Sequence, residues 1–256
     1  MIVDVNVSLS RWPFRRLRGD ETPELVEMLR QRGVRQAWVS SFDGLLHKDM
    51  AGVNERLAAE CRQRGEGILV PFGSVNPRLP DWEEDLRRCA EEHRMPGIRL
   101  HPNYHGCAPG DPAFARLLRA AAQRKLVVQI ALKMEDERTH HPLLRVPPVD
   151  ASRLHELIPS IAGLRLVVLN GTGLLSRGLL SKLAAAGAFF DIAMLEGVGG
   201  VARLADQVGV ERILFGSHFP LFTWEAARLK VAESGLDPSR ERAILSENAR
   251  RLLGGR

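Results

Sequence analysis

Six of the eight histidines in this sequence follow short β-branched or apolar runs, at points where strands are expected to end. The other two, His93 and His155, fall inside expected helices. Imidazole titrates near neutral pH, so it can accept or donate a proton in catalysis or ligate a metal ion. If the strand ends meet at one edge of a sheet, the six histidines mark a site. They are His47, His101, His105, His140, His141 and His218.

Acidic, amide and charged side chains occur in the same strand segments. In the segment IVDVNVSL, Asp4, Asn6 and Ser8 occupy alternate positions and therefore share one face of a regular strand, which we expect to point inward. Arg99 and His101 share a face by the same rule. A buried charge is costly unless it is paired. A structural ion pair between Asp4 and Arg99 is therefore an alternative to a catalytic role.

Three more polar residues belong to later strands of the pattern. Gln129 interrupts an apolar run, Asn170 ends the next run, and Asp191 ends the one after that. We expect them to join the same site. For Asn170, capping of the loop that follows is an equally good interpretation.

Cationic residues near the same strand ends favour an anionic small molecule. Arg15 follows the first strand in the loop SRWPFRR, and Arg138 lies in the long irregular segment 133–149 with Glu135 and His141. Loops of that length in compact domains are usually functional. In the first loop, Trp12-Pro13-Phe14 fits a lid over the site, or a patch that packs on the barrel mouth or on a second subunit.

These residues are positioned by an alternation of short apolar strands and amphipathic helices, which indicates βαβ units and a parallel sheet. Eight such pairs in one chain predict an α/β fold, a single-domain (β/α)₈ TIM barrel over residues 1–256 with an extra C-terminal helix. The absence of a glycine-rich phosphate fingerprint disfavours a doubly wound sheet. The expected strands are 2–7, 35–41, 68–75, 97–101, 126–132, 164–170, 188–193 and 211–217. The expected helices are 22–32, 51–64, 81–94, 112–124, 150–159, 174–186, 198–208, 223–233 and 238–253.

Composition narrows the class of protein and its partners. The formal charge of +5 comes from arginines spread along helices, with no nucleic-acid recognition motif, so we expect no nucleic-acid partner. Three cysteines without metal-site spacing and no apolar run of 18 residues predict a soluble cytoplasmic protein with no membrane partner. The expected partner is a small-molecule substrate or ligand, and a homo-oligomer stays open.

Several segments resemble the amidohydrolase-related proteins, a group that includes enzymes like aminocarboxymuconate-semialdehyde decarboxylase. The similar segments occur in the family's order from residue 2 to residue 253. They are IVDVNVSL at 2–9, FGSVNP at 72–77, GIRLHP at 97–102, ILFGSHFPL at 213–221 and ENARRLL at 247–253. The resemblance implies a barrel whose active site lies at the carboxyl ends of the strands, with a divalent metal held by histidines and an aspartate.

The differences from the family fall at its metal-ligand positions. The resemblance puts Asn6 and Ser8 on the two strand-one histidines, Ala131 and Gly171 on two later histidines, and His218 on the metal-binding aspartate. Zinc needs about three nitrogen, sulfur or carboxylate ligands from the protein. We therefore expect no metal at the family's site, and zinc or manganese only if a different site exists, such as one built from the rim histidines with Glu135 or Asp136.

Three interpretations follow. The first is an amidohydrolase-related enzyme with an atypical or absent metal, which hydrolyses a C–N or C–O bond or decarboxylates a small, anionic molecule. The second is a catalytically silent barrel that binds a small molecule or a partner protein, and the third is a scaffold. For the first, the predicted catalytic residues are His101, His218, Asp4 and Asp191. The predicted substrate-binding residues are Asn6, Arg15, Arg99, Gln129, Glu135, Arg138, His141 and Asn170.

Overall fold

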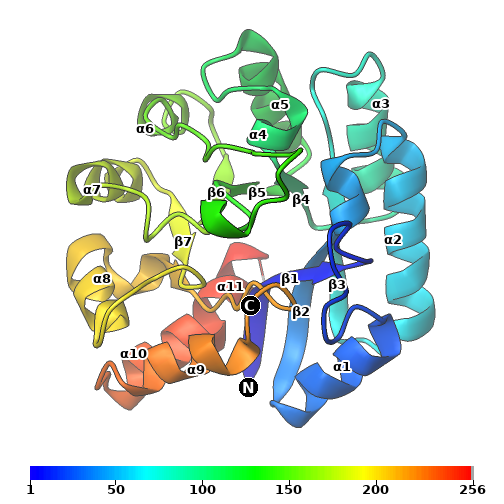
Figure 1. Ribbon diagram of the computed structural model, residues 1–256. Helices are drawn as coiled ribbons and strands as arrows, with labels where there is room; N and C mark the ends of the chain where they lie inside the picture. Colours follow the sequence, from blue (N-terminus) through cyan, green and yellow to red (C-terminus); the bar gives the residue numbers. More distant parts are fainter. Residues whose placement is uncertain (255–256) are drawn as a thin grey trace.

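The computed structural model describes residues 1–254, in which eight parallel strands follow one another in chain order around a barrel (Figure 1). This confirms the predicted (β/α)₈ fold. Each expected strand is present within a few residues of its predicted bounds. The strands are β1 (Ile2–Leu9), β2 (Val34–Ser41), β3 (Leu69–Ser74), β4 (Gly97–Leu100), β5 (Val127–Ala131), β6 (Arg165–Leu169), β7 (Phe189–Asp191) and β8 (Ile213–Leu214).

Helices surround the barrel (Figure 1). They are α1 (Thr22–Gln31), α2 (Met50–Arg64), α3 (Trp82–Arg87), α4 (Pro102–His105), α5 (Pro112–Gln123), α6 (Leu154–Leu157), α7 (Arg177–Ala185), α8 (Gly200–Val208), α9 (Trp224–Ala232), α10 (Pro238–Arg242) and α11 (Asn248–Leu252). The helix expected at 150–159 is reduced to α6, although Ile158, which precedes Pro159, keeps helical dihedrals. The helix expected at 81–94 continues from α3 as a π-helical turn over Arg88–Glu92.

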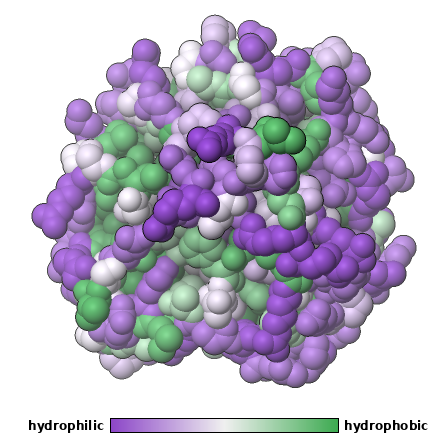
Figure 2. Space-filling model, viewed as in Figure 1, coloured by the Kyte–Doolittle hydropathy of each residue, from purple (hydrophilic) through white to green (hydrophobic). Residues whose placement is uncertain are grey.

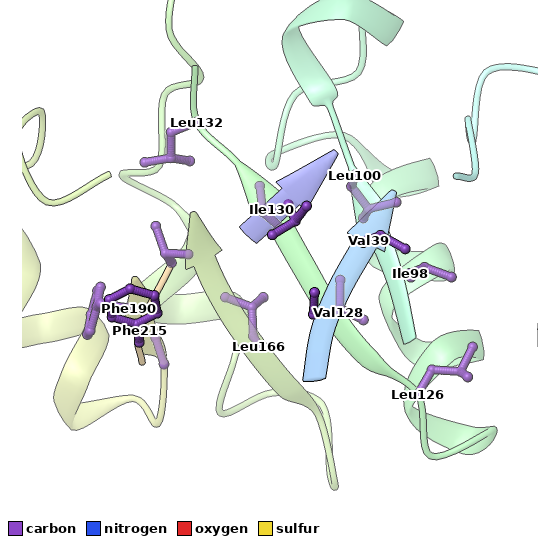
Figure 3. Packing of buried hydrophobic residues seen from close by; sticks show 14 of the residues in the cluster. Val39, Ile98, Leu100, Leu126, Val128, Ile130, Leu132, Leu166, Phe190 and Phe215 are labelled. Atoms are coloured by element: carbon purple, nitrogen blue, oxygen red, sulfur yellow. The ribbon is translucent and has the colours of Figure 1, made fainter. Parts of the chain in front are cut away.

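Alternation along the strands separates two apolar layers. Outward side chains such as Ile98, Leu100 and Val128 pack between the sheet and the helices (Figure 3). A second cluster, which includes Val5, Trp38 and Phe72, fills the interior of the barrel. On β4 this arrangement turns the intervening Arg99 and His101 inward, as predicted.

The alternation fails on β1, which contains a bulge. Asp4 pairs with Ala37 and Val7 with Val39, so three steps along β1 oppose two along β2. A bulge inserts one unpaired residue and redirects the side chains beside it. The prediction that Asp4, Asn6 and Ser8 share one inward face is therefore wrong at Asp4.

The barrel is closed by backbone contacts between its first and last strands. Val5 N–H donates to Phe215 O and Ser8 N–H donates to Phe219 O, both at 2.9 Å. At the amino end, Asn248 of α11 donates to the carbonyls of Val210 and Ile213, each at 2.8 Å. Helix α11 thereby seals the end of the barrel away from the predicted site.

Hydrophilic side chains cover much of the face that shows the mouth of the barrel, with hydrophobic patches mainly at its left (Figure 2). Cys61, Cys89 and Cys107 are buried free thiols. Within residues 1–254, no helix has the length and hydropathy needed to span a membrane.

Candidate active site

His218 lies at the carboxyl end of β8, where one of its ring nitrogens forms a hydrogen bond and the other has no partner. It adopts a left-handed backbone conformation with φ of 59°, which is uncommon for a residue with a side chain. Its Nε2 lies 2.7 Å from the carbonyl oxygen of Met134, so Nε2 carries the proton in the neutral ring. The buried Nδ1 has no hydrogen-bond partner and therefore offers a free lone pair.

His101, at the end of β4, is a second buried histidine with an unpartnered Nδ1. Desolvation lowers the pKa of His101 well below its ordinary value, and the nearby His105, Arg99 and His218 lower it further. Desolvation also lowers the pKa of His218 from 6.5 to about 4. Both imidazoles are therefore neutral near pH 7.

Asn6, Asn170 and Asp191 form a hydrogen-bonded network in the centre of the barrel. Asn6 Nδ2 donates to Asp191 Oδ2 at 2.7 Å and to Asn170 Oδ1 at 2.8 Å. The backbone N–H of Asn170 donates to Asp191 Oδ1, and its Nδ2 donates to the carbonyl of Lys133, both at 2.8 Å. All three residues are at most 1% exposed. We call this set the amide–carboxylate network.

The carboxyl group of Asp191 is ionised at neutral pH although the residue is buried. Desolvation raises the pKa of its carboxyl from 3.8 to about 6. The hydrogen bonds from Asn6 and from the Asn170 backbone, and the positive charges of Lys230 and Arg99, lower the pKa and so limit this rise. At neutral pH the ionised form dominates. Asp191 is thus a carboxylate held by two amide donors.

Asp4 is separated from that network. Its Oδ2 accepts from Trp224 Nε1 of α9 at 3.0 Å, and its Oδ1 accepts from the backbone N–H groups of Asn6 and Ser217, each at 3.1 Å. Desolvation raises the pKa of Asp4 to about 6 as well. Asp4 therefore joins β1 to β8 and α9, and the structure does not bring it to the histidines.

Arg99 lies inside the barrel with its donors already satisfied. Its guanidinium donates to the carbonyls of Val5, Val7 and Trp38 and to Gln129 Oε1, at 2.8 to 3.2 Å. Among residues 1–254, no carboxylate lies within 4 Å of it, so the alternative of an Asp4–Arg99 ion pair is wrong. Desolvation lowers the pKa of Arg99 only to about 10, which leaves it charged.

Gln129 completes this arrangement from β5. Its Oε1 accepts from Arg99, and its Nε2 donates to Val5 O at 2.7 Å. The bulge in β1 thus leaves carbonyls that Arg99 and Gln129 satisfy. Both residues donate their hydrogen bonds to backbone carbonyls or to each other, so neither presents a free donor to a substrate.

The loops that follow β1 and β5 meet above the site. Arg15 forms an ion pair with Glu135, which is only 5% exposed. Phe14 stacks on His141 with ring centroids 5.5 Å apart. Trp12, 2% exposed, packs edge-on against Phe14 below them, and its Nε1 has no hydrogen-bond partner. These contacts fit the first loop as a lid and equally as a patch that packs on the barrel mouth.

Arg138 is the third predicted anion-binding cation, and it lies apart from the buried histidines. Its side chain is 89% exposed and forms paired hydrogen bonds with Asp136 at 2.9 and 3.0 Å. The Asp136 pairing and the exposure place Arg138 on the outer surface of the lid.

Two features of the rim were not predicted from the sequence. The carbonyls of Lys133 and Met134 anchor Asn170 and His218, and no pattern of side chains signals such backbone contacts. The Lys133 side chain also lines a cavity of about 480 Å³ together with Phe222, whose ring centroid lies 5.2 Å from that of His218. Among residues 1–254, no carboxylate lies within 4 Å of the Lys133 ammonium group.

At the end of β6, Asn170 reaches the interior of the barrel and Gly171, which the resemblance places on a family histidine, does not. A Cβ at Gly171 would meet Val168 and Leu132 of the outer apolar layer. Asn170, with φ of 58°, turns inward instead. The residue in this strand that faces the interior is therefore Asn170.

The other rim histidines do not assemble a new metal site. His105 Nε2 lies 2.8 Å from the carbonyl of Gly44, and His141 stacks in the lid. Residues 1–254 contain no group of three or more His, Cys, Asp or Glu side chains placed to hold a metal ion.

Comparison with known proteins agrees with this architecture. The sequence profile of the amidohydrolase family matches residues 10–255. A search of curated proteins gave no match.

Solved structures with the same fold include three decarboxylases. The 2,6-dihydroxybenzoate decarboxylase from Rhizobium is 14% identical, with a TM-score of 0.73, and 98% of this chain and 99% of that chain align. The 5-carboxyvanillate decarboxylase from Sphingomonas paucimobilis is 10% identical, with a TM-score of 0.77 over 100% and 99% of the chains. A dihydroxybenzoic acid decarboxylase from a Polaromonas species, with bound manganese, is 11% identical, with a TM-score of 0.77 over 99% and 96%.

At these identities the structures show the shared fold, and the profile match over nearly the whole sequence shows the family. The resemblance noted in the strand-end segments is thereby confirmed. The relatives are enzymes, in line with the first of the three interpretations. The chain belongs to the amidohydrolase family.

Proposed function

We propose that this protein is an amidohydrolase-family enzyme that performs acid–base chemistry on a small, carboxylated molecule with its own histidines and without the family's metal. The observation that carries the proposal is the pair His101 and His218. Both are buried, both are neutral near pH 7, and both have an unpartnered Nδ1 at the mouth of the barrel. Unpaired buried polar atoms are rare and call for a functional explanation.

His218 is the proposed general base. Its Nε2–H is held by the Met134 carbonyl, so Nδ1 is the atom that accepts a proton. Its lowered pKa keeps it unprotonated over the neutral range. Once protonated in a desolvated site, it becomes a strong acid and readily returns the proton.

This cycle fits either reaction class of the family. In hydrolysis, His218 takes a proton from the attacking water and, once protonated, returns it to the leaving nitrogen or oxygen. The N–H of neutral His101 donates a hydrogen bond to the developing oxyanion. In decarboxylation, the C–C bond breaks, CO₂ leaves, and the carbon takes up a proton that comes from water and is passed to it through His218. Several of the solved relatives are named as decarboxylases of carboxylated rings, and a hydratase shares the fold, so carboxylated rings are the first substrates to test.

The residues present do not fit the manganese that the Polaromonas relative holds. Oxygen donors suit manganese, but the centre of this barrel offers one carboxylate, Asp191, already bound by the N–H groups of Asn6 and Asn170. The strand-five position is Ala131, which supplies no ligand. The proposed mechanism therefore uses protein groups alone.

Lys133 is the cation proposed to receive the substrate carboxylate. Arg99 has its donors satisfied inside the barrel, and Arg15 and Arg138 are paired with Glu135 and Asp136. Lys133 has no carboxylate within 4 Å in residues 1–254. It lines the cavity beside Phe222, which Lys230 and the carboxylates of Asp136, Glu196 and Glu233 also line. Arg15 joins it only if substrate entry separates the Arg15–Glu135 pair.

The test is a screen of carboxylated aromatic acids, lactones and amides against the wild type, His218→Asn and His101→Ala. Asparagine at 218 tolerates the left-handed backbone and cannot accept a proton. We expect turnover of one class in the wild type and a loss of at least about 100-fold in each variant, the usual scale of acid–base catalysis. His155→Ala, on a half-buried residue of α6, is the control.

Two results would overturn the proposal. Unchanged turnover in both variants would remove the histidines from the mechanism. Absence of turnover in the wild type, together with a rise in melting temperature on addition of a small acid, would support a binding protein instead.

A further inference from the structure

The amide–carboxylate network has the geometry of a metal centre with the metal replaced. Asp191 Oδ2 and Asn170 Oδ1, from the ends of two neighbouring strands, both point at one atom from β1, the side-chain nitrogen of Asn6. Carboxylate and amide oxygens that converge in this way are ligands for a hard cation. Here, the two hydrogens of an amide group fill the position between them.

The network leaves little space for a rearrangement that would admit an ion. A Cβ placed on Gly216 of the neighbouring strand end would lie 2.8 Å from Asp191 Oδ2 and 3.1 Å from the Asn6 Cβ. The backbone at Gly216 therefore packs directly against both side chains. Asn170 is fixed on its other side by its bond to the Lys133 carbonyl.

The charges around the network also need no additional cation. Asp191 is the only carboxylate in the network, and it accepts from Asn6 Nδ2 and from the Asn170 backbone. The positive charge of Arg99 and that of Lys230, whose Nζ lies 3.3 Å from Ile192 O, act on it from within the barrel and from α9. A divalent ion would have to displace the Asn6 donor to reach the carboxylate.

We infer that the side-chain nitrogen of Asn6 occupies the place of a divalent cation between Asp191 and Asn170. With the nitrogen in that place, the interior of the barrel does not bind a metal ion. If an oxygen replaces that nitrogen, a cation should again be needed between the side chains of residues 6 and 191. In Asn6→Asp, two carboxylates would face each other at hydrogen-bond distance with no donor between them. A buried uncompensated charge is strongly destabilising, and Mn²⁺ or Zn²⁺ would relieve it.

The experiment compares thermal unfolding of the wild type, Asn6→Asp and Asn54→Asp, with and without millimolar MnCl₂ or ZnCl₂. Asn54 is the matched control because it is buried and donates to a carbonyl, that of Ser74 at 2.8 Å, with no carboxylate in its hydrogen-bond set. We expect both variants to lose roughly 5–15 °C in melting temperature. Metal should restore a large part of that loss in Asn6→Asp only, and leave the wild type and Asn54→Asp unchanged.

A second measurement needs no variant. The wild type, incubated with excess Mn²⁺ or Zn²⁺ and passed through a desalting column, should retain far less than one equivalent by elemental analysis. Stoichiometric metal in the wild type would overturn the inference, as would an Asn6→Asp protein that metal stabilises no more than it stabilises Asn54→Asp. These readouts do not involve turnover, so they fail or succeed independently of the proposed reaction.

Discussion

At the scale of single residues, the chemistry depends on which nitrogen of a histidine is free. The Met134 carbonyl fixes the proton of His218 on Nε2, and the left-handed backbone at 218 aims the ring inward. The sequence alone located His101 and His218 at strand ends. It could not specify the tautomer, because the partner is a backbone carbonyl 84 residues away.

The burial of His218 makes a prediction about stability and pH. Because its folded pKa is about 4 and its ordinary value 6.5, the unfolded chain binds a proton between these values that the folded chain does not. The contribution of His218 to the stability of the wild type should therefore be lost as pH falls from 6.5 towards 4. When pH falls from 7.5 to 4.5, the unfolding free energy of His218→Asn should rise by roughly 2–3 kcal/mol relative to that of the wild type.

Urea unfolding of both proteins at the two pH values measures this difference. Asp4 and Asp191 titrate with the opposite sign, because their pKa values are raised to about 6 and their contribution is lost as pH rises through 6. That contribution is common to both proteins and cancels. His155→Asn is the control, and an equal wild-type-to-variant gap at both pH values would contradict the burial of a neutral His218.

At the scale of elements, the bulge in β1 decides which side chains reach the interior. It turns Asp4 towards α9 and leaves the carbonyls of Val5 and Val7 to Arg99. Period-two alternation predicted the inward face of β4 correctly and that of β1 incorrectly. The difference is physical, since a bulge depends on pairing with a neighbouring strand and leaves no clear mark in the strand's own sequence.

Arg99 should therefore be required for the bulge and not only for charge. A lysine keeps the charge but gathers its three donors at one atom, so at least two of the carbonyls that Arg99 satisfies would lose their partner. At about 1–3 kcal/mol for each unsatisfied buried group, Arg99→Lys should lose roughly 3–5 kcal/mol of unfolding free energy in urea.

The matched control is Arg165→Lys. Arg165 donates to a single carbonyl, Leu252 O at 2.8 Å, so its change should be several-fold smaller. Equal losses in the two variants would show that the five-donor geometry of Arg99 has no special role.

At the scale of the whole molecule, the fold was predictable and the site only in part. Eight local strand–helix units each carry their own periodicity, so the barrel follows from the pattern, as does the family from the segments around Asp4, His101, His218 and Asn248. The assembly of Asn6, Asn170 and Asp191 into one network depends on the closure of the barrel, which joins residues up to 185 positions apart. Local patterns cannot encode that convergence.

The central claim is that this barrel works through its own histidines and not through a metal. The most direct measurement is turnover of the best substrate from the screen by protein treated with chelator and shown by elemental analysis to be free of divalent metal. We expect full activity in the treated wild type and a loss of at least about 100-fold in treated His218→Asn. Activity that disappears with the chelator and returns with manganese or zinc would contradict it.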